Sequence, residues 1–140
     1  MSSVGTVNWG VISTARIGTE KVIPAMQASG VQILAICSRD ADRAAAVASE
    51  LGIPRHYGSY QQMLDDPDID AVYNPLPNSL HAEWTIKAAE AGKHVLCEKP
   101  MADNVEQAIA MTRACTANDV HLMEAFMWRF GNRVRQVREL

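Results

Sequence analysis

The sequence predicts an α/β fold in which a six-stranded parallel sheet is doubly wound, with helices on both of its faces. Two observations lead to this prediction. Short apolar runs with the length of buried strands alternate with amphipathic runs of helical spacing along the whole chain. The connections between them are short, and strand–helix–strand units of this kind form right-handed crossovers and therefore parallel sheets.

In the first half of the chain, each strand run is followed by a helical run. "TVNWGVIS" and "VQILAICS" are apolar and short enough for buried strands, and apolar Val22, Ile23 and Met26 recur at helical spacing between them. "DADRAAAVASEL" opens with acidic residues, which suit the amino end of a helix, and stops at Gly52. "HYGSYQQMLDDP" contains a strand end and a short helix. These elements are expected at 6–13, Gly18–Ser29, 31–38, 40–51 and 56–67.

The second half repeats the scheme. "DAVYNPL" and "KHVLCEKP" are the fourth and fifth strands, and the helix between them, "SLHAEWTIKAAEAG", is closed by Gly92. "NVEQAIAMTRACTAN" is a helix and "VHLMEAFM" the sixth strand. These elements are expected at 70–76, 79–92, 93–100, 104–118 and 120–127, with a further helix that begins at Arg133 and continues to Leu140.

Composition narrows the function classes. With 140 residues, 48% of them hydrophobic, and a formal net charge of -3, the chain suits one globular domain with a real core. Its pI near 5.8 and the lack of basic runs argue against nucleic acid and anionic membranes as partners. The three cysteines have no C-x-x-C spacing and apolar neighbours, so buried thiols in a reducing compartment are expected, without disulfide or metal. With no membrane-length apolar run and no charged leader, a cytoplasmic location is expected.

The segment after the first strand, "STARIG", lies where ligands bind in doubly wound folds, beyond the carboxyl ends of the strands. A dinucleotide turn carries G-x-G-x-x-G there, but Ser13 and Ala15 replace the first two glycines, and only Gly18 is kept. Both replacements are small, so the backbone can still approach a pyrophosphate, with hydroxyls and helix-head amides as donors. An ordinary turn without a ligand is the alternative. The donors would come from Ser13, Thr14, Ala15, Arg16 and Ile17.

The segment "CSRDADR" at the end of the second strand indicates which dinucleotide would bind. About 20 residues beyond the turn, an NAD-binding protein has an acidic residue for the ribose hydroxyls. Ser38 and Arg39 stand there instead and suit a 2′-phosphate, which favours NADP, with NAD still compatible. Asp40 is expected to cap the following helix, although it becomes the ribose ligand if the strand ends later. Arg43 is either a second cation for the phosphate or a solvated surface residue.

The chain resembles the Gfo/Idh/MocA oxidoreductases in "WGVISTARIG", "CSRD", "YGSYQQML", "PLPNSLH", "AGKHVLCEKPM" and "LMEAFMWRF", which occur in the family's order. "AGKHVLCEKP" is the most specific of these, and "MEAFMWRF" is most similar to the dihydrodiol and xylose dehydrogenase branch. The family's turn is glycine-rich, and Ser13 and Ala15 depart from that pattern. The departure affects the expected geometry of pyrophosphate binding rather than the resemblance to the family. The resemblance implies that 1–126 form an NAD(P)-binding Rossmann domain. It also implies that 127–140 begin a substrate domain whose remainder is missing, so that this chain alone would bind cofactor without turnover.

The implied reaction is hydride transfer between nicotinamide and a hydroxyl or carbonyl carbon of a small molecule such as a sugar, polyol or dihydrodiol. A homo-oligomer is implied for the complete protein. Lys99 would transfer the proton, and its place at the end of a buried strand predicts partial desolvation, which suits acid–base work. Glu98 would orient Lys99 or balance its charge, a structural ion pair being the alternative. The resemblance also implies a cis bond between Lys99 and Pro100.

The remaining residues implied by the resemblance lie in "PLPNSLH" and "MWRF". Asn78 and His81 would contact ribose or nicotinamide, but a helix cap and a satisfied helix histidine are equally open. Trp128 would form a wall of the nicotinamide site or belong to the core. A non-catalytic NADP-sensing or scaffold domain is the alternative function, and the retained Lys99 favours an enzyme. The further cofactor contacts are Pro75, Leu76 and Arg129.

Overall fold

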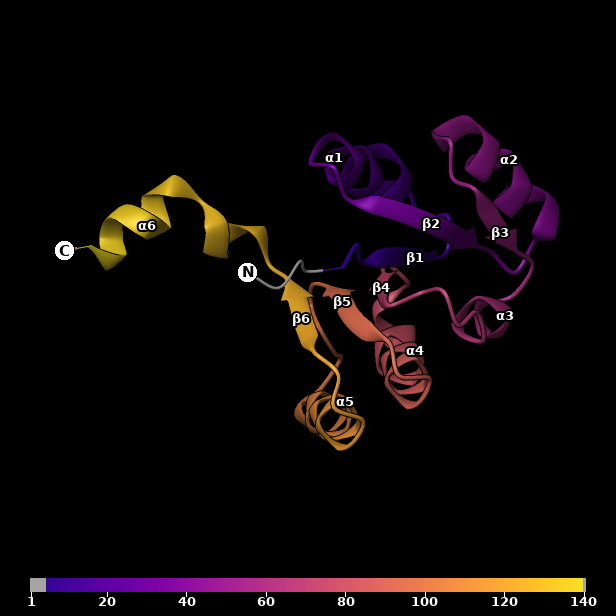
Figure 1. Ribbon diagram of the computed structural model, residues 1–140. Coiled ribbons are helices and arrows are strands. Elements are labelled where there is room, and N and C mark those ends of the chain that lie inside the picture. The colour runs from indigo at the N-terminus through magenta and orange to yellow at the C-terminus, as the bar shows by residue number, and fades with distance from the viewer. Residues whose placement is uncertain (1–4, 140) are drawn as a thin grey trace.

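The computed structural model describes residues 5–139, and its centre is a parallel sheet (Figure 1). The strand order is β3-β2-β1-β4-β5-β6, and every neighbouring pair is parallel. The order reverses direction between β1 and β4, which is the doubly wound arrangement that the alternating pattern predicts. The strands are β1 (Asn8–Ile12), β2 (Gln32–Cys37), β3 (Arg55–Tyr57), β4 (Ala71–Asn74), β5 (His94–Glu98) and β6 (Leu122–Ala125).

Helices cover both faces of the sheet, as predicted (Figure 1). On one face lie α1 (Ile23–Ala28) and α2 (Ala41–Leu51), and on the other α3 (Tyr60–Leu64), α4 (Asn78–Glu90) and α5 (Val105–Ala117). The other helical segments are the π-helix η1 (Gly18–Val22), the 3-10 helix η2 (Met127–Phe130) and α6 (Asn132–Arg138).

Two apolar cores form because successive strand residues point to opposite faces of the sheet. Val11 and Tyr73 pack with α1 and α2, whereas their neighbours Ile12 and Val72 pack with α3, α4 and α5. Strands that are buried on both faces explain the continuous apolar runs of the sequence. The three cysteines are also buried, as expected: Cys37, Cys97 and Cys115.

The helix after β1 differs from its predicted form. Helical geometry begins at Arg16 rather than Gly18, runs to Ala28, and widens into a π turn at Gly18–Val22. Pro24 explains the widening, because it has no amide hydrogen and its ring displaces the carbonyl one turn earlier. The predicted strands are also longer than the observed ones, since the ends of the apolar runs belong to turns. Leu140 and residues 1–4 of the predicted domain lie outside the described residues.

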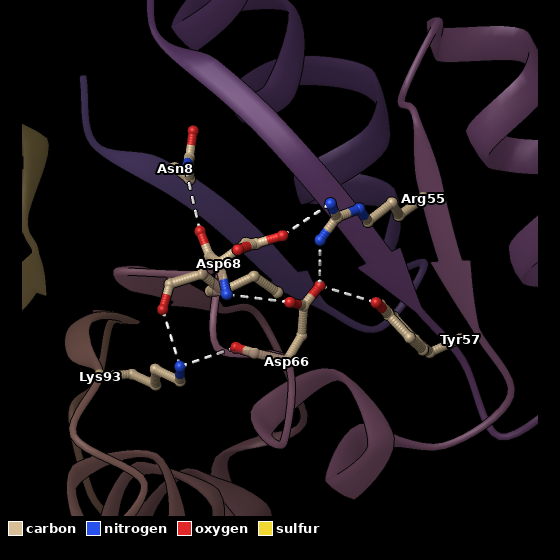
Figure 2. Close-up of polar contacts among 7 residues, drawn as sticks. Asn8, Arg55, Tyr57, Asp66, Asp68 and Lys93 are labelled. Atoms are coloured by element: carbon tan, nitrogen blue, oxygen red, sulfur yellow. Dashed lines mark hydrogen bonds and ion pairs between the residues drawn. The ribbon is translucent and has the colours of Figure 1, made fainter.

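A network of polar side chains joins the amino ends of the strands on the edge of the sheet opposite the ligand edge (Figure 2). Its centre is the buried Asp66, whose Oδ2 accepts hydrogen bonds from Arg55 Nη1 at 2.8 Å and Tyr57 Oη at 2.7 Å. Asp66 Oδ1 accepts from the Asp68 amide at 3.0 Å. We call this the amino-edge network, and its labelled members are Asn8, Arg55, Tyr57, Asp66, Asp68 and Lys93.

The buried cation of the amino-edge network is Lys93, which immediately precedes β5. Its Nζ donates to the backbone carbonyls of Asp66 and Ile69, each at 2.8 Å, so the ammonium is satisfied although the residue is only 6% exposed. The network therefore attaches the loop between α3 and β4 to β1, to β3 and to the residue that precedes β5.

Beyond β6 the chain leads away from the sheet through η2 and α6 (Figure 1). Trp128 is 68% exposed, so the alternative that it belongs to the core is wrong for this domain. Phe126, Met127 and Phe130 are exposed as well. Within the described part of the chain, every helix is too short or too polar to cross a bilayer.

Candidate functional site

A hollow of about 320 Å³ opens at the carboxyl ends of β1 and β2. Segments from four places in the chain meet there: the turn after β1, the end of β2, the start of α3 and the loop after β4. Its lining residues are Ser13, Thr14, Ala15, Ser38, Arg39, Asp40, Arg43, Tyr60, Leu76 and Pro77.

The turn after β1 has the geometry of a glycine turn without its first glycine. Ser13 has φ of 81°, in the left-handed region that a side chain makes costly. Its Oγ accepts a hydrogen bond from the Ala15 amide at 3.3 Å, and its hydroxyl hydrogen stays available for an acceptor. Helical geometry begins at Arg16, and the first turn of a helix leaves its amides without partners inside the helix.

Gly18 occupies the third glycine position of the turn, where the helix packs near the sheet, although the space there would admit a Cβ. A Cβ placed on it would lie 3.5 Å from Tyr73 Cε1 and 3.6 Å from Pro75 Cγ. The Arg16 side chain turns outward and pairs with Glu20, Nε to Oε1 at 2.8 Å. In this structure the Arg16 side chain is thus engaged at the surface through Nε and Nη2.

The segment after β2 and the first turn of α2 bring two cations to the rim of the hollow. Ser38 is buried, and its Oγ accepts from the Asp40 amide at 3.2 Å. Asp40 Oδ1 in turn accepts from the Arg43 amide at 3.1 Å, which makes Asp40 the amino cap of α2, as expected. Arg39 and Arg43 are exposed, and within 5–139 neither guanidinium forms an ion pair. The rim is therefore suited to an anion.

Tyr60 is a member of the hollow that the sequence reasoning missed. It begins α3, is buried, and packs edge-on against Trp84 with ring centroids 4.9 Å apart. Burial raises the pKa of its hydroxyl, and the nearby charge of Arg39 acts in the opposite direction. Its position in the sequence could have identified it, because it follows soon after β3, where the chain reaches the ligand edge of the sheet. Pro77 also lines the hollow, as does Asp40, which the sequence offered as a ribose ligand only if the second strand ended later.

In the first turns of α4, the predictions for His81 and Asn78 have different outcomes. His81 is completely buried, with Nε2 2.7 Å from the Leu76 carbonyl oxygen and Nδ1 2.9 Å from that of Pro100. Both ring nitrogens therefore face backbone carbonyl oxygens, so the protein itself holds His81, and a neutral imidazole donates its one N–H to one of the two oxygens. Asn78 is exposed at the first residue of α4, where the cap position is Pro77 and has no side-chain bond, so the capping alternative for Asn78 is wrong.

The turn after β5 is held from several sides. Glu98 Oε1 accepts from Tyr73 Oη at 2.6 Å, and Glu98 Oε2 accepts from the Lys99 amide at 3.2 Å. Among the described residues Glu98 forms no ion pair with the Lys99 ammonium, so the ion-pair alternative is wrong. The bond between Lys99 and Pro100 is cis, as expected.

The predicted desolvation of Lys99 is wrong for this domain, because the residue is exposed. The physical reason is that β5 ends at Glu98, so Lys99 lies beyond the sheet and outside both cores. Burial of its ammonium would have to come from a bound ligand or another part of the protein.

This arrangement agrees with comparisons to known proteins. A family of oxidoreductases with an NAD-binding Rossmann fold matches residues 7–126. The chain belongs to the Gfo/Idh/MocA family. The family match covers all six strands and every residue that lines the hollow.

Curated relatives of this Gfo/Idh/MocA chain include enzymes that act on sugars and diols. A D-xylose 1-dehydrogenase (NADP(+)) from Haloferax volcanii is 52% identical, over 94% of this chain and 41% of that protein. A trans-1,2-dihydrobenzene-1,2-diol dehydrogenase from Xenopus laevis is 37% identical, over 94% of this chain and 41% of that protein. The chain thus spans about two fifths of the length of these relatives.

Among solved structures, a 3-ketoreductase from Actinomadura kijaniata in complex with NADP and TDP-benzene has the same fold. Its TM-score is 0.89 at 38% sequence identity, over 95% of this chain and 41% of that one.

The structure brings seven of the fifteen predicted site residues together in the lining of the hollow. Glu98 ends the neighbouring strand β5, Lys99 follows it, and Pro75 is buried beside Gly18. Ile17 is 41% exposed in the first helical turn, whereas Arg129 lies in η2, on the segment that leads away from the sheet (Figure 1). The predicted residues that line the hollow are Ser13, Thr14, Ala15, Ser38, Arg39, Arg43 and Leu76.

Proposed function

We propose that this chain is the NADP-binding domain of an oxidoreductase that acts on a hydroxyl or carbonyl carbon of a sugar, polyol or dihydrodiol. The main support for this proposal is the composition of the rim of the hollow. The buried Ser38 hydroxyl and the exposed guanidinium groups of Arg39 and Arg43 line it. The single carboxylate that lines the hollow, Asp40, caps α2 through its Oδ1. The names of the xylose dehydrogenase and the solved ketoreductase complex, both with NADP, support the proposal.

The residues present fit a dinucleotide phosphate. The pyrophosphate would lie against the Ser13 hydroxyl and the backbone amides of Thr14 to Ile17, and the adenosine 2′-phosphate against Ser38, Arg39 and Arg43. Bound cofactor would supply a nicotinamide that exchanges hydride with substrate carbon. Lys99, on the turn after β5, would hold and transfer the proton of the substrate oxygen.

Replacement of Arg39 by alanine tests the cofactor assignment. It is expected to weaken NADP binding by about 1.5 to 3 kcal/mol, the range for hydrogen bonds to charged groups, and to leave NAD affinity nearly unchanged. Calorimetric titration of this chain with both cofactors measures the difference. Arg113→Ala, an exposed arginine on α5, serves as the matched control. Preference of the unmodified chain for NAD would contradict the proposal and point to Asp40 as a ribose ligand.

Replacement of Ser13 by glycine separates strain from ligand binding. Because Ser13 has a left-handed backbone, the change is expected to raise the unfolding free energy by about 0.5 to 1 kcal/mol. Loss of the hydroxyl donor is expected to weaken NADP binding by about 0.5 to 1.5 kcal/mol. Urea unfolding and cofactor titration measure the two effects. Asp119→Gly, which has φ of 54° in the turn before β6, should change stability alone; tighter NADP binding by Ser13→Gly would refute the hydroxyl's role.

The proposal extends to the organisation of the whole protein. Residues 1–126 would form the cofactor domain, and 127–140 would begin a substrate domain that supplies most substrate contacts, so this chain alone would not turn over substrate. The end of the family match at residue 126 and the exposed side chains of η2 support this division. A homo-oligomer and a cytoplasmic location remain predictions, the latter supported by three buried, unpaired thiols.

A further inference from the structure

Tyr73 touches both turns of the proposed site from inside the sheet. Its ring is fully buried in the core beneath α1, and its Cε1 lies 3.5 Å from the place that a Cβ on Gly18 would take, near the head of the helix that follows the first turn. Its hydroxyl reaches the end of β5 and donates to Glu98 Oε1 at 2.6 Å. One side chain therefore links the pyrophosphate turn to the strand that ends next to Lys99.

The bond from Tyr73 fixes the orientation of the Glu98 carboxylate. Burial, and then the hydrogen bond to Glu98, raise the pKa of Tyr73, so the hydroxyl remains a donor throughout the neutral range. With one oxygen held by Tyr73, the other oxygen accepts from the Lys99 amide at 3.2 Å. The chain of bonds runs from the core to the backbone from which Lys99 projects.

We infer that Tyr73 is a positioning residue for the proposed reaction, and that it acts through Glu98 to fix the backbone of Lys99. The inference rests on the proposed role of Lys99. The far side of the turn has separate contacts: His81 Nδ1 lies 2.9 Å from the Pro100 carbonyl oxygen, and Glu124 Oε1 accepts from the Met101 amide at 2.9 Å. Loss of the Tyr73 hydroxyl therefore loosens Lys99 while the remainder of the turn stays attached.

Replacement of Tyr73 by phenylalanine removes the hydroxyl and keeps the ring that packs in the core. In the domain, hydrogen exchange of the Lys99 amide, followed by NMR, should accelerate about tenfold, while the Met101 amide keeps its rate. NADP affinity should stay within about twofold. The matched control is Tyr57→Phe, which removes an equivalent hydroxyl–carboxylate bond of 2.7 Å at the opposite edge of the sheet. Equal Lys99 exchange rates in the Tyr73→Phe variant and the unmodified domain would overturn the inference.

Kinetics of a full-length enzyme that contains this domain give the second readout. Tyr73→Phe should lower kcat about tenfold with the KM for NADP unchanged, and Tyr57→Phe should change neither. Because both act on one chain of bonds, Tyr73→Phe and Glu98→Gln should be non-additive in kcat. Additive losses, or an unchanged kcat in Tyr73→Phe when Lys99→Met is inactive, would overturn this inference alone. Unchanged turnover in Lys99→Met would instead overturn the proposed role of Lys99.

Discussion

Replacing Asp66 by alanine is expected to lower the free energy of unfolding of this domain by about 2 to 4 kcal/mol. The variant leaves Arg55, Tyr57 and the Asp68 amide without the acceptor that all three share. We expect a smaller loss of stability than for a fully buried ion pair, because the Arg55 side chain is 40% exposed and water screens its charge. Guanidinium chloride unfolding measures the loss. Asp65→Ala, at the exposed neighbouring carboxylate, is the control and should change stability by less than about 0.5 kcal/mol.

The effect of Asp66 on stability should depend on pH in a defined direction. Burial opposes ionisation of Asp66, but hydrogen bonds from Tyr57, the Asp68 amide and Arg55 together hold its pKa below the ordinary value. A carboxyl group with a lowered pKa stabilises the folded state fully above its unfolded pKa, and this contribution disappears as pH falls through the folded value. The stability difference between the unmodified domain and Asp66→Ala should therefore shrink below about pH 4. A constant difference between pH 7 and pH 3 would contradict the ionised network.

Replacement of Lys99 by methionine is expected to lower the turnover of a full-length enzyme containing this domain by about a hundredfold or more, the usual scale of general acid–base catalysis. Methionine keeps an unbranched side chain of similar length but carries no proton. Since Lys99 is exposed and lies outside both cores, the variant should fold normally and keep its NADP affinity. Steady-state kinetics with a sugar or dihydrodiol substrate, together with NADP titration, test both expectations.

A second lysine provides the control for Lys99. Lys87→Met removes a cation that pairs with Glu83 and lies 4.3 Å from the Trp84 ring centroid on the surface of α4. It should leave turnover unchanged. If Lys99→Met and Lys87→Met both kept full turnover, the proton would have to be transferred by another group, and the sensing or scaffold alternative would gain support.

The fold was predictable because it depends on local patterns that repeat along the chain. Strands buried on both faces appear as short apolar runs, and the helix caps Asp40 and Gly52 lie where their residue types predict them. The same pattern could not show the π turn at Gly18–Val22, since it results from the position of a single proline. Strand ends were also uncertain, because apolar residues continue into the turns.

For the site, the sequence could predict which segments of the chain contribute, but not which side chains contact one another. The rule that ligands lie beyond the carboxyl ends of the strands identified the turns that contribute to the hollow. Contacts across the sheet depend on strand register, which pairs Tyr73 with Leu96 and so brings its hydroxyl to Glu98. No sequence spacing reveals such a pair. The exposure of Lys99 was missed for a related reason: the apolar run "HVLC" that comes before it lies within the sheet, but the strand ends before Lys99.

The burial of Cys37, Cys97 and Cys115 has a practical consequence for measuring ligand binding. Burial raises the pKa of Cys37 and Cys97 to about 12 and that of Cys115 above its ordinary value, and only the thiolate reacts readily. Maleimide dyes should therefore leave the native thiols unlabelled at neutral pH. A cysteine introduced at the exposed Gln62, two residues from Tyr60, would carry the fluorophore alone. The domain could then report occupancy of the hollow as an optical signal, with every native cysteine retained.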